Sequence, residues 1–181
     1  MSTQVPPFLE NKTLLRLLRT GVFLWMIVWP LIILGFWLSL PKLPESWITQ
    51  FVDVSKYTIT PCVPWIGSAV SLLPIAIHFL LCLNLIRLFN NWLKGIIFSE
   101  QTIRIFTKLS LFYLLGTVSG ILMNTLNSLL LTMGNTPGEH ILSLSFSSTD
   151  LSGLGTAGFL YVLAFIMRQA YQLQKDADLT I

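Results

Sequence analysis

The chain has 181 residues, of which 54% are hydrophobic and only 10% are charged, and its formal net charge is +3. Globular proteins carry about 25% charged residues, and a water-soluble fold with far fewer would expose apolar surface to water. The composition therefore excludes an ordinary soluble domain and indicates that most of the surface faces lipid. Because the basic residues form no single long polar face, direct binding of DNA or RNA is also excluded.

The first long uncharged run is 20–40, which matches the about 20 residues that cross a bilayer core. A basic amphipathic lead, 12–19, precedes it, as in a signal peptide. The apolar core of a signal peptide is shorter, however, and no small-x-small cleavage site precedes Pro41. We predict a retained span that is kinked at Pro30, since neighbouring helices can satisfy the carbonyl that proline leaves free.

Three further uncharged runs, 57–86, 109–133 and 151–167, predict spans at 65–86, 109–133 and 151–170, the last of which continues through Arg168. With the first run, they predict an all-α integral membrane protein in which residues 1–181 form one membrane domain. The expected architecture is a four-transmembrane-helix bundle.

The distribution of Lys and Arg predicts how the bundle is threaded. Nine of the 11 lie in the amino-terminal lead, in the loop between the second and third spans, or in the carboxy-terminal tail. The other two, Lys42 and Lys56, lie in the first loop, and the third loop, 134–150, has none. By the positive-inside rule, both termini and the central loop are cytoplasmic.

The two remaining loops contain strand-like patterns. Segment 141–147 alternates apolar residues with serine, and segment 51–60 on the same side is rich in β-branched and aromatic residues. We predict that they pair into a small extracytoplasmic β-ribbon from loops 1 and 3. The alternative is two irregular loops on the lipid headgroups, because a two-stranded sheet is marginal in water.

One ionisable side chain, His78, lies well inside a predicted span, about 13 Å from the inner boundary. Asn124 and Asn127 share a face of the third span, at least about 22 Å from that boundary and so at another level. Ionisable residues at such depth are candidate functional sites. Two interpretations stay open: a neutral histidine hydrogen-bonded between helices, or a proton or ligand site with both asparagines along the path.

Gly116 and Gly120 form a small-xxx-small pair that lets two helix backbones approach closely. The close approach can occur between two helices of one bundle. The alternative is an approach between helices of two copies, which would form a homo-oligomer.

No residue pattern indicates catalysis. Cys62 and Cys82 are too few for a disulfide framework and predict two unpaired thiols. His78 and His140 have no partners at metal-ligand spacing, and no phosphate-binding glycine loop is present. We predict no catalytic residue, no metal and no cofactor, and hence a protein that is not an enzyme.

The central segment, 86–112, combines a turn at Gly95 with a helix capped by Ser99. Glu100 suits the positive end of that helix and lies four residues before Arg104. The segment is either an interfacial elbow neutralised by anionic lipid or a docking site for a cytoplasmic protein. With the tail it defines a candidate cytoplasmic interaction surface, composed of Lys94, Gly95, Phe98, Glu100, Arg104, Lys108, Asp178 and Leu179.

The same residues carry a family resemblance. The core KGIIFSEQTIRIFTKLSLFYLLG, within 88–116, fits the pattern Lys-Gly-x-x-Phe-Ser/Thr-Glu followed by a basic helix, and the ending QKDADLTI fits an acidic-Leu-Thr-Ile signature. Together they resemble the bacterial four-pass membrane proteins of the domain of unknown function 2975. One departure is Arg168-Gln-Ala-Tyr171, where the family pattern has Arg-x-Gly.

The resemblance implies a multi-pass protein of the bacterial inner membrane, often encoded beside a small helix-turn-helix regulator. It favours a non-enzymatic signalling or regulatory component whose partners are the lipid bilayer and a soluble cytoplasmic protein. The alternative is a subunit of an oligomeric channel or small-solute transporter, with the path lined by His78, Asn124 and Asn127.

Overall fold

The computed structural model describes residues 12–44, 48, 59–136, 142–144 and 146–179. Its elements are helix α2 (Lys12–Ser39), the short 3-10 helix η1 (Leu40–Lys42), α4 (Val63–Leu93), α5 (Glu100–Thr132) and α6 (Ser148–Leu179). The four long helices are each long and apolar enough to cross a membrane. An all-helical protein with four such helices is therefore confirmed, and α2 and α4 continue through Pro30 and Pro74.

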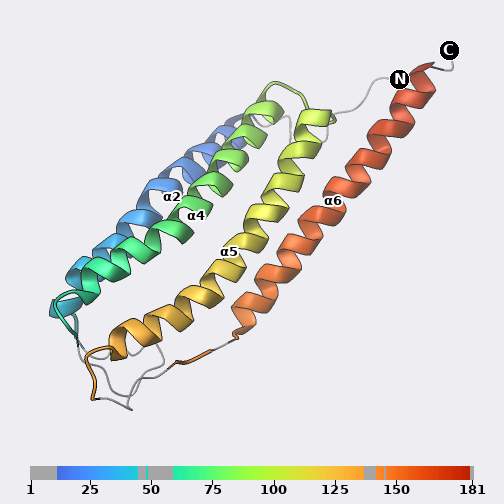
Figure 1. Ribbon diagram of the computed structural model, residues 1–181. Coiled ribbons are helices and arrows are strands. Elements are labelled where there is room, and N and C mark those ends of the chain that lie inside the picture. Colours follow the sequence, from blue (N-terminus) through green and yellow to red (C-terminus); the bar gives the residue numbers. More distant parts are fainter. Residues whose placement is uncertain (1–11, 45–47, 49–58, 137–141, 145, 180–181) are drawn as a thin grey trace.

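The helices pack in the order in which they follow one another: α2 against α4, α4 against α5, and α5 against α6 (Figure 1). The start of α2, the α4–α5 turn and the end of α6 lie at one end of the molecule, which we call the basic end. The opposite end, with η1 and the starts of α4 and α6, we call the loop end.

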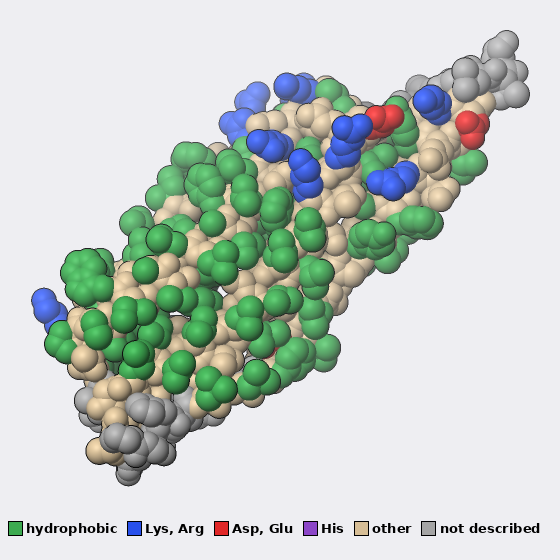
Figure 2. Space-filling model, viewed as in Figure 1, with side chains coloured by type: hydrophobic (Ala, Val, Ile, Leu, Met, Phe, Trp, Pro, Cys, Tyr) green, Lys and Arg blue, Asp and Glu red, His purple; other side chains and the backbone are tan. Residues whose placement is uncertain are grey.

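The flanks of the helices are apolar and outward-facing (Figure 2). Only 11% to 22% of the most apolar stretch of each long helix is buried inside the protein. Leu24, Leu73, Leu122 and Phe159 are among the many large side chains that remain exposed. Such a surface would be unfavourable in water and is the surface expected of helices in lipid.

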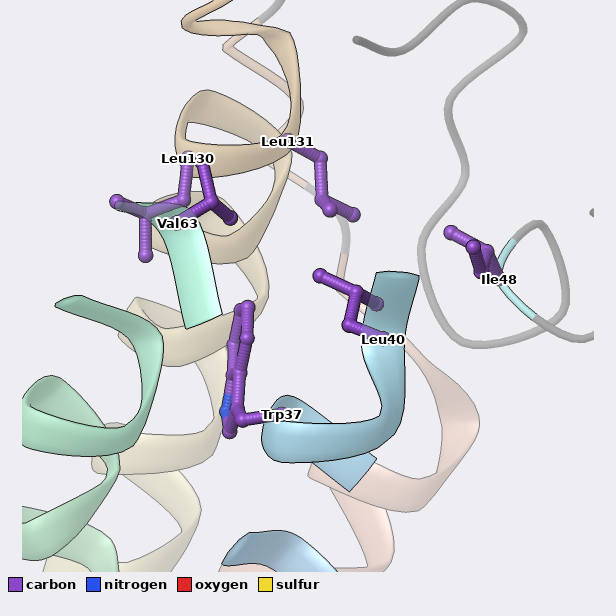
Figure 3. Close-up of a cluster of buried hydrophobic side chains, with 6 residues drawn as sticks. All are labelled: Trp37, Leu40, Ile48, Val63, Leu130 and Leu131. Atoms are coloured by element: carbon purple, nitrogen blue, oxygen red, sulfur yellow. The ribbon is translucent and has the colours of Figure 1, made fainter. Parts of the chain in front are cut away.

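A buried cluster at the loop end ties three helices together (Figure 3). Its members are Trp37, Leu40, Ile48, Val63, Leu130 and Leu131. The Trp37 indole connects α2 to α4 within this cluster. Its Nε1 donates a 2.8 Å hydrogen bond to Ser71 Oγ, and its ring lies against Gly67. This contact fixes the separation of α2 and α4.

Helix α6 packs on α5 through small residues. A Cβ at Gly153 would lie 2.5 Å from Thr117 Oγ1, and Ala157 is buried. Ser110 Oγ donates a buried 2.8 Å hydrogen bond to the Ala157 carbonyl. Towards the basic end, Leu160 packs against a second cluster, which consists of Leu88, Ile105 and Leu109.

The predicted β-ribbon is not supported. No strand occurs in the described residues, which include 59–60, 142–144 and 146–147; the rest of both segments lies outside them. The physical reason is that helix ends bind the loop backbone. Ser143 N donates to Ser128 Oγ at 3.0 Å, and Ser147 N donates to Asp150 Oδ2 at 2.8 Å, so both donors are taken by side chains rather than by a neighbouring strand.

We expect Gly67→Ala to destabilise the protein by about 1–3 kcal/mol, because the added methyl group would overlap the buried Trp37 ring and force it to shift. The matched control is Gly158→Ala, where a Cβ meets no atom within 4 Å. There the change should be neutral or stabilising by up to about 1 kcal/mol. Unfolding of both variants by denaturant in detergent measures the difference; equal stabilities would contradict this account of the α2–α4 contact.

Candidate functional site

Basic side chains gather at one end of the molecule (Figure 2). They come from all four long helices and the α4–α5 turn: Lys12, Arg16, Arg19, Arg87, Lys94, Arg104, Lys108, Arg168 and Lys175. Within the described residues, the loop end has one Lys or Arg, Lys42 in η1. The described protein is thus strongly polarised in charge along the helix direction.

Two motifs hold the α4–α5 turn at the basic end: one ends α4, and the other begins α5. Gly95 has φ 76°, and its N–H donates to Trp92 O at 2.9 Å, while Ile96 N donates to Asn91 O at 3.0 Å. This hydrogen-bond pair is a Schellman ending, which favours glycine at the left-handed position. The predicted turn at Gly95 is confirmed.

The next helix begins as the sequence predicts. Ser99 Oγ accepts a hydrogen bond from Thr102 N at 3.2 Å, and Glu100 occupies the first turn of α5. Arg104 Nη2 lies 3.3 Å from Glu100 Oε2. That ion pair is well exposed and contributes little stability, so the cap and the Schellman ending are what make the turn rigid.

The structure brings most of the predicted interaction surface together around this turn. Lys94, Gly95, Phe98, Glu100, Arg104 and Lys108 are all exposed. Phe98 is 61% exposed and Ile96 40%, so an apolar patch lies among the charges. Asp178 and Leu179 end α6 at the same end of the molecule; their side chains lie outside the described part.

The predicted intramembrane residues line one groove. It has a volume of about 1270 Å³ and receives residues from α2, α4, α5 and the first turns of α6; His78, Asn124 and Asn127 are among them. Gly116 lies level with Ile77, since a Cβ there would be 3.8 Å from Ile77 Cγ2. Asn124 is two turns nearer the loop end, about 12 Å away at 1.5 Å per residue, so the difference in level is as predicted.

His78 has partners on both sides. Its Nε2 lies 3.5 Å from Cys82 Sγ in the next turn of α4. From α2, the ring centroid of Trp29 is 6.0 Å away. These contacts support the interpretation of His78 as a residue that joins α2 to α4.

Gly116 and Gly120 do not make a tight helix contact within the described chain. A Cβ at Gly120 would meet nothing within 4 Å, and both glycines line the groove instead. The close approaches occur at Gly67 and Gly153. Gly67 could have been found from its spacing, because it forms a small-xxx-small pair with Ser71, and both contact Trp37.

Asp150 is a groove residue that the sequence reasoning missed. It is 8% exposed and forms a reciprocal cap with Ser147, whose Oγ accepts from Asp150 N at 3.2 Å. The sequence pattern that could have identified this cap is a serine followed three residues later by an acid at the start of a span. Among the described residues, no group of three or more His, Cys, Asp or Glu could hold a metal ion.

Four antiparallel apolar helices with a basic end define a class, that of small helical proteins able to cross a membrane several times. Residues 49–181 match the family described as "Protein of unknown function (DUF2975)", and the chain belongs to this family. The resemblance noted in the central segment and the tail is therefore confirmed. No curated protein and no solved structure matches the chain.

Replacing Ser99 tests the cap that orders the turn. We expect Ser99→Ala to destabilise the start of α5 by about 1 kcal/mol, because the Thr102 N–H loses its acceptor. Ser99→Asp should keep the stability, since aspartate is an equally good cap. Amide hydrogen exchange of residues 100–104 measures the effect. Faster exchange in both variants would show that the side-chain acceptor is not what holds this turn.

Proposed function

We propose that the protein is a small four-pass component of the bacterial inner membrane that acts in signalling or regulation and is not an enzyme. Its basic end lies in the cytoplasm and contacts a soluble partner, for which a helix-turn-helix regulator is the leading candidate. The observation that carries this proposal is the exposed Phe98 among basic side chains on a turn fixed at both ends.

The charge polarity supports the orientation. Lys and Arg near the ends of membrane spans are retained on the cytoplasmic side, and in the described chain they gather at the end that contains the α4–α5 turn. In the proposed orientation, both termini lie in the cytoplasm and η1 lies outside.

The rigidity of the turn supports docking over a purely lipid-facing elbow. A surface that is already ordered loses little conformational entropy on binding. An aromatic anchor with charges around it is a common arrangement in protein interfaces, where the charges steer the partner and set specificity. Lys94, Arg104 and Lys108 outnumber Glu100 here, so the partner surface is acidic.

Charge reversal tests the docking surface. Lys94→Glu combined with Arg104→Glu should weaken capture of the helix-turn-helix partner by at least about tenfold, because like charges replace complementary ones. Lys42→Glu, which reverses a basic residue at the loop end, is the control and should leave capture unchanged. Co-purification from native membranes is the measurement. The proposal fails if both proteins capture the regulator equally, or if the wild type captures none.

A native cysteine tests the orientation. Cys62 is exposed at the start of α4, whereas Cys82 is buried. A membrane-impermeant maleimide should therefore label the protein in right-side-out vesicles, and Cys62→Ser should abolish the labelling. Lys94→Cys in the Cys62→Ser background should react only after the membrane is opened. The reverse pattern of labelling would place the basic end outside.

The alternative, an oligomeric channel or small-solute transporter, draws support from the groove that His78, Asn124 and Asn127 line. Its polar side chains gather towards the loop end, however, while leucines line the part nearer the basic end. A polar path through the membrane is not formed by one copy, so solute flux in proteoliposomes would be needed to favour this function.

A further inference from the structure

The groove has most of its polar side chains at one end and is mainly apolar along the rest. Its loop-end half is lined by Asn124 and Asn127 from α5 and by Thr149, Asp150 and Ser152 from the start of α6. Towards the basic end the lining is mainly apolar and includes Leu17, Leu18, Leu81 and Leu85; polar atoms are fewer there and come from His78, Cys82, Tyr113 and Thr117. A molecule that fits this lining has a polar head at the loop end and an apolar chain that runs towards the basic end.

Two asparagine side chains in the groove have polar atoms without hydrogen-bond partners. Most hydroxyls in the spans bond to their own helix, as Thr117 Oγ1 does to Tyr113 O at 3.1 Å and Thr125 Oγ1 to Ile121 O at 3.2 Å. Asn127 Oδ1, in contrast, is buried without a hydrogen-bond partner. The exposed Asn124 also has none among the described residues. Unpaired polar groups in an apolar environment are unfavourable, so these amides favour a ligand that offers hydrogen bonds.

The charges of the lining restrict the head group. Among the described residues, no Lys or Arg lines the groove, and Asp150 is the one Asp or Glu that does. An anionic head would meet no cation among these described residues and would be repelled by Asp150. The Asp150 carboxylate already accepts from Ser147 N and Ser147 Oγ, at 2.8 and 2.7 Å, and lies in the first turn of α6, at the positive end of the helix dipole. A cationic head is therefore not required, and neutral hydroxyl groups suit the amides best.

The groove has room for a long chain. Its volume of about 1270 Å³ exceeds the about 300–1,000 Å³ of ordinary small-molecule pockets. Glycines keep it open, since a Cβ at Gly35 on α2 or at Gly120 on α5 would meet nothing within 4 Å. The stacked rings of Trp25 and Trp29, with centroids 5.4 Å apart, contribute to its α2 wall.

We propose that this groove binds a neutral lipid with a glycerol head, of the monoacylglycerol or diacylglycerol type. The glycerol hydroxyls hydrogen-bond with Asn124 and Asn127, and the acyl chain follows the leucines between α2, α4 and α5. This site is separate from the basic end, and the proposal does not depend on a cytoplasmic partner.

The experiment uses the full chain in phosphatidylcholine nanodiscs and a monoacylglycerol with a photoreactive group in its chain. Cross-linked peptides should map to the groove segments 17–39, 71–85 and 112–127. A fatty acid and an alkylamine with the same photoreactive chain should cross-link at least about tenfold less, which corresponds to about one hydrogen bond of selectivity. Equal cross-linking of all three probes, or cross-links mainly elsewhere, would overturn the proposal.

Variants distinguish the part of the groove that holds the acyl chain from the part that holds the glycerol head. Gly120→Phe fills the groove and should reduce cross-linking of the monoacylglycerol at least about tenfold, and Gly35→Leu on the facing helix is a second filling variant. Gly158→Phe, at a glycine outside the groove lining with nothing within 4 Å of its Cβ, is the matched control and should not change cross-linking.

Asn124→Leu combined with Asn127→Leu should leave the chain in place but remove the preference for the glycerol head. Retention of that preference would contradict the assignment of the amides. Unchanged cross-linking in both Gly120→Phe and Gly35→Leu would show that the probe lies elsewhere.

Discussion

The satisfaction of polar groups in an apolar surrounding is the constraint on which this structure depends. Every backbone N–H and C=O in lipid must be paired internally, and helices achieve this within each span. Most hydroxyl side chains follow the same rule. Thr107, Thr125 and Thr156 each donate to a carbonyl four residues earlier in their own helix, whereas Ser119 Oγ is buried without a partner. The helices therefore need few polar contacts with one another.

The four long helices form a row in which each packs against the next in the chain. The few polar contacts between helices consequently determine how this row is assembled. Trp37 to Ser71 and Arg19 to Asn90 join α2 and α4 near opposite ends, and Ser110 joins α5 to the Ala157 carbonyl in α6. Each bond links long helices that are consecutive in the chain, and extensive packing among the described long helices also occurs only between consecutive ones. A row of this kind can curve without closing, and a groove lined by α2, α4, α5 and the first turns of α6 is left open.

The sequence was sufficient to predict those features that depend on a single segment of the chain. Apolar runs predicted the four long helices, and the spacing of Gly95, Ser99 and Glu100 predicted the turn. The ribbon is not supported in the described residues because its pattern was local, whereas the bond from Ser143 N to Ser128 Oγ connects a loop to a helix end. The groove could not be predicted, because a small-xxx-small pair such as Gly116 and Gly120 does not specify whether a helix or an open space faces it.

The two candidate surfaces are connected through the same rigid elements. Helices α4 and α5 form part of the groove and continue to the basic end, where the cluster of Leu88, Ile105 and Leu109 also contacts Leu160 of α6. The turn between them is fixed by a Schellman ending on one side and by the Ser99 cap on the other. A change in what fills the groove can therefore reach the basic surface only by moving α4 and α5 as whole helices, because the turn itself has little freedom to rearrange. A partner bound at that turn would respond to the relative position of these helices rather than to a local unfolding.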